Sequence, residues 1–359
     1  MLLRLNGILN KVQMEDIQEN YLISIVLPVY NGQEFLSDSI KSCISQTHKN
    51  WELIIVNDAS VDNSLVIANK FASEDNRIKI ISNTTNQKLP ACLNIGHKAA
   101  NGRFITWTSD DNCYKPTALK SMLIALLKQN ADLVFADFNI IDSEGKIIGA
   151  NIYNSNHTIL LENIIRACFL YRKEVFKRND GYDEDLFKIE DFAFWQMASQ
   201  HSNFIYLPEN LYFYRSHANS LTAKKTISQF NYKPEYNNTV RKMYFKFFKS
   251  FGLKNLEYLS ELFAKFHLHQ EINIYEFLKK YSQFRIDMSE VLKFYGEEEI
   301  LKQLDVRIRY NILKNKSNQN IKTLILIAIK RPYILLNYSK KRSLYIIFRL
   351  LFNRRNFNF

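Results

Sequence analysis

The stretch LISIVLPVYNGQEFLSDSIKSCISQTHKNWELIIVND, which runs from Leu22 to Asp58, decides the fold. Its first part, residues 22–30, is a continuous β-branched run, as is typical of a strand that is buried on both faces. Asn31-Gly32 ends this run, and apolar residues then recur at helical spacing over 35–44. A second buried strand is predicted at 51–58. This strand, helix and strand order predicts a parallel pair joined by a helical crossover.

The same alternation continues towards residue 142. Further strands are predicted at 77–82, 103–108 and 132–142, and further helices at 62–71, at 91–100 and from Pro116. This order predicts an α/β fold, in which a mixed, mostly parallel sheet is flanked by helices. After about residue 225 the pattern changes to aromatic-rich helices, predicted at 243–251, 256–268 and 272–284, which form a C-terminal helical extension. We predict four parts: an arm at 1–20, the α/β domain at 21–225, a helical region at 226–301 and a basic amphipathic tail at 302–359.

Composition places the chain among globular proteins. It has 359 residues, of which 47% are hydrophobic and 14% aromatic, too apolar for a disordered protein. The four cysteines are scattered without a C-x-x-C pair, which predicts reduced thiols rather than a disulfide framework or a zinc site. The first twenty residues lack the apolar run of a secretory signal, and no run is long enough to span a membrane. We therefore expect a cytoplasmic protein.

The positive charge is concentrated in the tail. The formal net charge is +12, and residues 302–359 hold 14 Lys or Arg against one acid, Asp305. Apolar clusters at 323–329 and 344–352 alternate with these cations. A solvated helical face, a nucleic-acid surface and an anionic lipid surface each account for the charge. The bulky apolar residues favour lipid, because phosphate binding does not require them. We expect peripheral contact with the inner face of the cell membrane, and no nucleic acid partner.

Polar residues gather where the predicted strands end, which is where ligands bind in such sheets. The sharpest case is TSDDN, Thr108–Asn112, after the strand at 103–108. Adjacent carboxylates repel each other unless a cation or hydrogen-bond donors offset the charge. A divalent ion that bridges diphosphate oxygens would offset it and would stabilise a departing nucleoside diphosphate. A solvated turn that caps the helix at Pro116 explains the same residues equally well.

Four blocks of sequence together resemble the family 2 glycosyltransferases, which have a GT-A fold. The blocks are LISIVLPVYNGQEFLSDSIKSCISQTHKNWELIIVNDASVDNS, LPACLNIGHKAANGRFITWTSDDN, FLYRKEVFKRNDGYDEDLFKIEDFAFW and YFYRSHANSLT. They cover about 22–222 in order and at the expected spacing. The resemblance implies a nucleotide-binding GT-A sheet and the activity of an inverting glycosyltransferase, which moves hexosyl or N-acetylhexosaminyl groups. The donor it implies is a nucleotide sugar, most often a UDP-sugar.

The resemblance implies two sets of donor-binding residues. Pro28, Tyr30 and Asp58 match positions that hold the nucleotide base and ribose. Asn94 matches a segment near the donor. Arg215 has the guanidinium geometry that suits diphosphate oxygens, although a structural ion pair explains it equally well.

The resemblance also implies a metal site for Mg²⁺ or Mn²⁺ at Asp110, Asp111 and His217. Relatives have Asp-Ala-Asp-Asp where this chain has Thr108-Ser109-Asp110-Asp111. Asp110 aligns with the acid that contacts the metal, whereas Thr108 replaces the first acid of the pattern. His217 matches a third metal or diphosphate contact, but a lone histidine is as often a surface or core residue.

Glu190 and Asp191 align with the acidic pair that supplies the general base, and we expect Asp191 to be that base. An inverting transfer needs one carboxylate to accept the proton of the attacking hydroxyl. Without the resemblance, the simpler explanation is an acidic helix start that opposes the helix dipole. Tyr182, Asp183 and Asp185 match the region that sets acceptor specificity.

The expected acceptor is a growing polysaccharide or a lipid-linked oligosaccharide. Two other classes remain open at this point. A nucleotide-sugar pyrophosphorylase would have a Gly-rich loop soon after the first strand, and here only Gly32 is present. A non-catalytic membrane- or nucleic-acid-binding protein on a degenerate GT-A sheet is favoured only by Thr108. Metal-dependent donor hydrolysis separates the enzyme from the binding protein.

Overall fold

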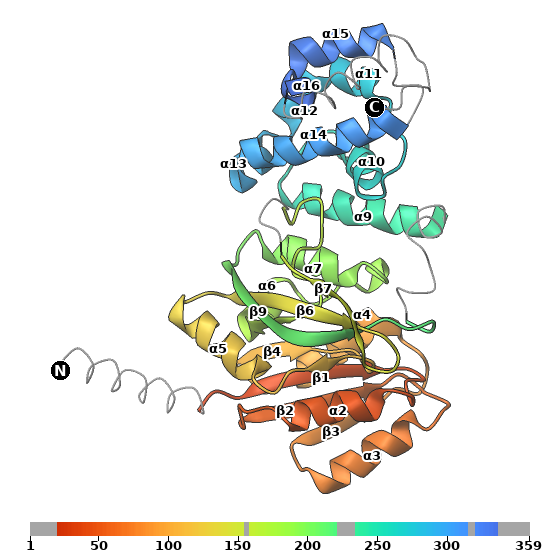
Figure 1. The fold of residues 1–359 in the computed structure, drawn as a ribbon, viewed down its shortest axis with the longest axis vertical. Helices are drawn as coiled ribbons and strands as arrows, with labels where there is room; N and C mark the ends of the chain where they lie inside the picture. The colour runs from red at the N-terminus through yellow and green to blue at the C-terminus, as the bar shows by residue number, and fades with distance from the viewer. Residues whose placement is uncertain (1–19, 154–157, 221–233, 315–319, 337–359) are drawn as a thin grey trace, which may run out of the picture. The chain divides into compact units, whose positions relative to one another are not determined.

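The computed structural model describes residues 20–153, 158–220, 234–314 and 320–336. The chain divides into two compact units (Figure 1). The sheet unit comprises residues 1–153 and 163–224, and the helical unit comprises 154–162 and 225–359. Almost all of the predicted arm at 1–20, and the apolar cluster at 344–352, lie outside the described residues.

The sheet unit is built on one mixed sheet, with the strand order β3-β2-β1-β4-β8-β6-β9-β5 and with β7 paired to β6. The strands are β1 (Ile23–Val29), β2 (Trp51–Asn57), β3 (Ile78–Ser82), β4 (Phe104–Trp107), β5 (Cys113–Tyr114), β6 (Leu133–Ile141), β7 (Ile147–Asn151), β8 (Phe169–Arg172) and β9 (Phe204–Arg215). Strands β1 to β4 are parallel, and β6 pairs in parallel with β9. Strand β8 lies antiparallel between β4 and β6.

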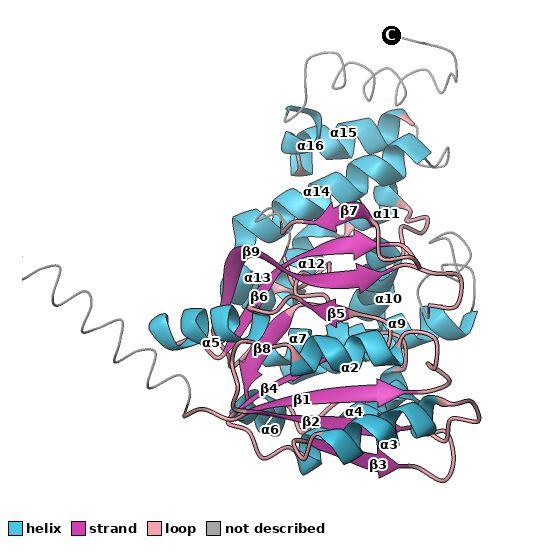
Figure 2. Ribbon diagram, turned by 60° about the horizontal axis from the view of Figure 1, so that its bottom comes forward, coloured by secondary structure: helices cyan, strands magenta, loops and turns pink. Residues whose placement is uncertain are grey.

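Helices cover both faces of this sheet (Figure 2). They are α2 (Leu36–Ile44), α3 (Ser64–Glu74), α4 (Lys88–Ala99), α5 (Ala118–Lys128), α6 (Lys173–Arg178) and α7 (Glu190–Ala198), with a 3-10 turn η1 at Glu184–Leu186. On one face α2 and α5 share a core with Ile23 and Ile25 of β1. On the other face α4 packs so closely that a Cβ at Gly96 would lie 2.3 Å from Val26. The predicted α/β fold is confirmed.

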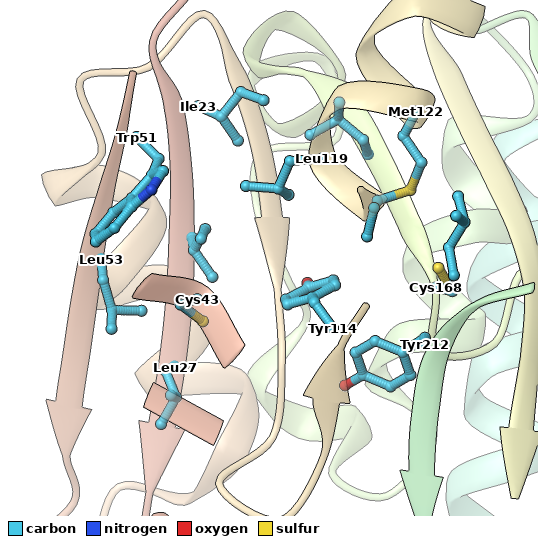
Figure 3. Packing of buried hydrophobic residues seen from close by; sticks show 14 of the residues in the cluster. Ile23, Leu27, Cys43, Trp51, Leu53, Tyr114, Leu119, Met122, Cys168 and Tyr212 are labelled. Atoms are coloured by element: carbon cyan, nitrogen blue, oxygen red, sulfur yellow. The ribbon is translucent and has the colours of Figure 1, made fainter. Parts of the chain in front are cut away.

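The main core of the sheet unit lies between β1, β2 and the helices α2 and α5 (Figure 3). Every residue of β1 and β2 is buried, as the continuous apolar runs predicted. Tyr114 of β5 and Tyr212 of β9 extend this core towards the other end of the sheet. Strand β5 was not predicted, because two residues carry no periodicity.

The helical unit has an aromatic core. Its helices are α9 (Pro234–Ser250), α10 (Leu256–His267), α11 (Ile274–Lys279), α12 (Tyr281–Asp287), α13 (Ser289–Tyr295), α14 (Glu297–Lys314), α15 (Ile321–Lys330) and α16 (Tyr333–Leu336). Phe248, Phe263 and Phe284 are buried, and Phe263 contacts both of the others. The single helix predicted at 272–284 is divided between α11 and α12.

Part of the predicted basic tail belongs to this folded unit. Helix α14 runs across residue 302, where the tail was predicted to begin, and Leu304, Ile308 and Ile312 on it are buried. The division into parts at 225 and 301 otherwise stays a prediction. Among the described residues, no helix is both long and apolar enough to cross a membrane.

One buried carboxylate, that of Glu52, joins the amino ends of four strands. It accepts hydrogen bonds from Ser24 Oγ of β1 at 2.7 Å and from Lys79 Nζ of β3 at 2.8 Å. The backbone N–H of Asn101, just before β4, donates to it at 2.6 Å. Burial alone would raise the pKa of Glu52, but these hydrogen bonds outweigh it and lower the pKa to about 2. The ionised form is therefore the one that stabilises the fold.

We expect Glu52→Gln to destabilise the protein by about 2–3 kcal/mol at neutral pH. The pKa of Glu52 falls from 4.5 to about 2 on folding, so its contribution is present above about pH 4.5 and is lost as the pH falls towards 2. Urea unfolding at several pH values measures the difference between wild type and variant. The difference should shrink below about pH 4. The exposed Glu74→Gln is the matched control, and a Glu52→Gln variant as stable as this control would contradict the prediction.

Candidate active site

The loops that follow β1 and β2 are joined to each other by hydrogen bonds. The N–H of Asn31 donates to Ser60 Oγ at 3.0 Å, and Asn31 Oδ1 accepts from the N–H of Val61 at 2.9 Å. The N–H of Gly32 donates to Ser64 Oγ at 2.9 Å. Tyr30, at the start of the first loop, is 52% exposed. The paired loops therefore hold an exposed ring in a fixed place at the carboxyl ends of the strands.

Asp58 is buried beside these loops, at the start of α4. Its carboxylate accepts hydrogen bonds from Asn83 Nδ2 at 2.8 Å and from the backbone N–H groups of Gln87 and Lys88 at 2.8 and 2.9 Å. Pro28, the last residue but one of β1, pairs in register with Val56 of β2. The two predicted base-binding positions are thus fixed by backbone pairing and by helix capping.

The structure brings Asp111 and His217 together. His217 Nε2 lies 3.0 Å from Asp111 Oδ2. The other oxygen, Asp111 Oδ1, is buried and has no hydrogen-bond partner among the described residues. A buried acceptor without a partner costs free energy, so this oxygen is suited to a cation or a donor group that is not part of the chain.

Asp110 lies against the backbone of the loop after β1. A Cβ at Gly32 would lie 1.9 Å from Asp110 Oδ2, so any larger residue there would displace this carboxylate from its present position. Burial, and then the charge of Asp111, raise the pKa of Asp110 to about 7. Burial also raises the pKa of Asp111, although its contact with His217 opposes the shift. Two carboxyl groups that resist ionisation together are the signature of a site that lacks a positive charge.

The donor set therefore fits Mg²⁺ or Mn²⁺, since hard divalent ions prefer carboxylate oxygens. Asp110, Asp111 and His217 are the predicted ligands, and the unpartnered Asp111 Oδ1 is the observation that favours an ion. These residue types suit such an ion, but within the described ranges no group of three or more His, Cys, Asp or Glu side chains is arranged to hold a metal ion. The structure brings together Asp111 and His217, and the site of three ligands stays a prediction.

The second acidic pair begins helix α7. Glu190 accepts a hydrogen bond from the N–H of Lys188 at 2.6 Å. Asp191 accepts one from the N–H of Phe192 at 2.7 Å and one from Asn163 Nδ2 at 2.8 Å. Burial raises the pKa of both carboxyl groups, and the charge of Asp191 raises that of Glu190 further. A general base must be ionised to accept a proton, and a raised pKa makes the ionised carboxylate of the pair a stronger base.

Comparisons with known proteins show the family of the chain. The family model described as glycosyl transferase family 2 matches residues 24–180. The uncharacterised glycosyltransferase EpsJ of Bacillus subtilis is 31% identical over 252 residues, which are 65% of this chain and 71% of that protein. The chain belongs to glycosyl transferase family 2. It is a glycosyltransferase, and neither the pyrophosphorylase nor the non-catalytic alternative is favoured.

Two further proteins are similar to this glycosyltransferase. WfgD of Escherichia coli, a UDP-Glc:α-D-GlcNAc-diphosphoundecaprenol β-1,3-glucosyltransferase, is 33% identical over 153 residues, 42% of this chain and 59% of WfgD. The crystal structure of S. aureus TarS 1–349 in complex with UDP has a TM-score of 0.54 at 16% identity, over 89% of this chain and 91% of that one. The likeness to TarS supports the GT-A fold.

Thr108, which replaces the first acid of the family pattern, is turned into the core of the glycosyltransferase. It is buried, and its Oγ1 lies 2.6 Å from Tyr212 Oη. Its side chain is thereby held by strand β9 rather than beside Asp110. Where the family pattern has an acid, this chain thus has a threonine whose hydroxyl contacts that of Tyr212.

Arg215 is buried and its guanidinium is already well used. It donates to the carbonyl oxygens of Asp111 at 2.9 Å and Ser143 at 3.0 Å, and it stacks over Phe35 at 4.4 Å. Asp38 lies 3.4 Å from it. These contacts hold the backbone of Asp111 in place. The predicted diphosphate contact of Arg215 stays a prediction, beside this observed positioning role.

Asn94 is bonded to the predicted acceptor segment. Its Nδ2 donates to the carbonyl oxygen of Tyr182 at 2.8 Å and to Glu184 Oε1 at 3.0 Å, while its Oδ1 accepts from the N–H of Tyr182 at 2.7 Å. The whole amide is therefore committed to this segment. Its predicted contact with the donor stays a prediction.

Asn163 is a site residue that the sequence analysis missed. It lies between the second and the third of the four family blocks, 28 positions from Asp191, and nothing in its local pattern points to a site. Gly32 was noted as the end of a strand and as the one glycine soon after it, not as a site residue. Its close approach to Asp110 was hidden because the two residues come from different loops.

We expect Asp110→Asn to stabilise the metal-free glycosyltransferase at about pH 8, where the pKa of about 7 leaves Asp110 mostly ionised. The neutral amide removes the cost of burying a charge and, next, the repulsion with Asp111, which together we take as about 1–3 kcal/mol. The melting temperature in the presence of EDTA should rise by several degrees, since each kcal/mol is worth about 2–4 °C in a domain of this size. The exposed Glu144→Gln should not change it. An unchanged or lowered melting temperature for Asp110→Asn would refute the electrostatic account.

Proposed function

We propose that this glycosyltransferase inverts the anomeric centre as it moves a sugar from a nucleoside diphosphate onto an acceptor hydroxyl. The observation that carries the proposal is the presence of two acidic pairs, wholly or partly buried, with raised pKa values: Asp110–Asp111 and Glu190–Asp191. Each pair suits a different task in such a transfer. The first suits a cation beside the leaving diphosphate, and the second suits the base for the attacking hydroxyl.

The proposed donor is a UDP-sugar. Its base and ribose would lie against Pro28, Tyr30 and Asp58, at the carboxyl ends of β1 and β2, where open α/β sheets bind their ligands. The exposed ring of Tyr30 offers a stacking surface. The UDP bound by TarS and the UDP-glucose in the name of WfgD support this choice of nucleotide.

The proposed ion is Mg²⁺ or Mn²⁺, held by Asp110, Asp111 and His217. When bound, it supplies positive charge that stabilises the departing nucleoside diphosphate. Three contacts support this proposal: Gly32 leaves room for Asp110, His217 contacts Asp111, and Arg215 donates to the carbonyl oxygen of Asp111.

The proposed chemistry at the acceptor side assigns the base to Asp191. The acceptor hydroxyl oxygen forms a bond to the anomeric carbon while its proton passes to the Asp191 carboxylate. The bond from that carbon to the diphosphate breaks, and its electron pair leaves with the nucleoside diphosphate. Attack from the face opposite the leaving group inverts the centre. Asn163 orients the carboxylate by donating to Asp191 Oδ2.

The proposed acceptor is a glycan or lipid-linked oligosaccharide, positioned near Tyr182, Asp183 and Asp185. Asn94 holds the backbone of this segment through hydrogen bonds with both the carbonyl oxygen and the N–H of Tyr182. The diphosphoundecaprenol acceptor in the name of WfgD supports a lipid-linked molecule, as part of cell-envelope polysaccharide synthesis. We further propose that the basic residues after 302 hold the enzyme at an anionic membrane surface.

Asp191→Asn should lower kcat by about 100-fold or more and leave donor binding nearly unchanged. The amide keeps the shape of the side chain but cannot accept the proton. Transfer from the matching nucleotide sugar to an acceptor is measured at saturating acceptor, and UDP affinity is measured separately by calorimetry. The exposed Glu174→Gln on α6 serves as the control. If Asp191→Asn keeps more than about a tenth of the wild-type kcat, Asp191 is not the base.

Asp110→Ala should abolish the Mn²⁺-dependent part of UDP binding, and Asp111→Ala should weaken it less. Bound ligand raises the melting temperature by mass action, so thermal shifts with UDP at increasing Mn²⁺ report both affinities. The carboxylate of Asp111 already contacts His217, whereas that of Asp110 does not, which is why the two effects should differ. Equal losses for the two variants would show that both carboxylates contribute alike, and would overturn the assignment of Asp110 as the principal ligand.

A further inference from the structure

The outer face of α15 is apolar, which is the reverse of the usual arrangement for a surface helix. Ile321, Ile325 and Ile329 recur at every fourth position, so they line one side of the helix. They are 56%, 52% and 67% exposed, respectively. The opposite side, with Thr323 and Ile327, is buried. We call the three exposed isoleucines the isoleucine stripe.

The helical unit holds this stripe in a fixed orientation. Helix α15 packs against α11, and Asn320 caps its first turn by accepting from the N–H of Thr323 at 2.9 Å. At the other end, Arg331 Nε donates to Asp305 Oδ1 of α14 at 3.0 Å. Arg309 of α14 donates to the carbonyl oxygen of Ile334 in α16 at 2.9 Å. Within the helical unit, α15 lies at the opposite end from α9 (Figure 1). The stripe is thus a built surface and not a frayed end.

Positive charge borders the stripe. An open groove of about 800 Å³ begins at Ile329 and is also lined by Ile286, which is 66% exposed, and by Arg285, Lys293 and Lys330. Arg285 is paired with Glu297, whereas Lys293 has no acidic partner in the described part of the helical unit. Lys330 Nζ donates to Ser282 Oγ at 3.1 Å. The groove therefore combines apolar side chains with cations that face the same opening.

We propose that the isoleucine stripe and the adjoining groove form the surface by which the enzyme docks on an anionic lipid bilayer. The isoleucines enter the headgroup boundary, and Lys293, Lys330 and the neighbouring Lys322 contact lipid phosphates. This deepens the proposed membrane attachment, on which it rests, by naming the residues that touch lipid. It also places Arg285 and Lys293, which precede residue 302, in the attachment surface.

Charge selects this occupant over two others. Residues 320–359 contain nine Lys or Arg and no acid. A second copy of the chain that covers the stripe would bring the same cations face to face, and like charges at close range repel. The residues after 336 would add six more Lys or Arg to an already positive border. An anionic bilayer has negatively charged headgroups at its surface and apolar acyl chains below them, so it complements both the cations and the isoleucine stripe.

Flotation of the full-length protein with vesicles tests the proposal. Wild type should bind vesicles of phosphatidylglycerol and phosphatidylcholine, and bind phosphatidylcholine alone much more weakly. Ile325→Ser combined with Ile329→Ser should lower partitioning by about 10-fold or more, and raised salt should not restore it. Lys322→Gln combined with Lys330→Gln should lower partitioning to the anionic vesicles by roughly 10-fold, an effect that salt also produces in wild type.

A matched control carries Val66→Ser and Ile148→Ser, two side chains of the sheet unit that are 67% and 57% exposed. It should bind vesicles as wild type does, and all variants should keep the wild-type melting temperature. If wild type does not float, membrane attachment as a whole is wrong. If wild type floats and the isoleucine variant floats equally well, the attachment stands and the stripe is not its surface. A third outcome also overturns the proposal. If the isoleucine variant binds vesicles as wild type does, but loses a concentration-dependent dimer that wild type forms, the stripe joins two copies of the chain.

Discussion

The fold of the sheet unit depends on the Glu52 carboxylate. Its partners come from β1, from β3 and from the turn before β4, so one buried charge sets the relative positions of four parallel strands at their amino ends. Parallel strands in register also end in register. The loops that carry Asn31, Asp58 and Asp110 therefore emerge at one edge because the opposite edge is pinned. Removing one partner of such a network is costly, since the others remain buried and unpaired.

The sequence was informative where the chemistry is local. The continuous apolar runs at 22–30 and 51–58 predicted two buried strands, and Asp110-Asp111 stood out because adjacent acids after a buried strand need an explanation. The explanation of Glu190 and Asp191 that needs no family resemblance, an acidic helix start, agrees with their place at the start of α7. Each of these signals lies within a few residues of the feature that it predicts, so periodicity and motifs are enough to predict that feature.

The remaining features depend on contacts between distant positions. Asn163 is 28 positions from Asp191, and Thr108 is 104 positions from Tyr212. In the sequence, Arg215 looks the same whether its guanidinium binds a diphosphate or, as here, backbone carbonyl groups. The tail shows the same limit in another form. Its charge was visible in the sequence, but the burial of Ile308 and the exposure of Ile325 required the packing of α14 and α15 to be known.

The closeness of Gly32 to Asp110 has a consequence for how the protein tolerates mutation. The backbone of Gly32 does not have the positive φ that would demand glycine, and so the fold itself would accept an alanine there. What an added methyl group would meet is the end of the Asp110 side chain. A mutational scan should therefore separate two properties at this codon. Protein abundance would be nearly indifferent to small residues, while fitness under selection for activity would accept glycine alone.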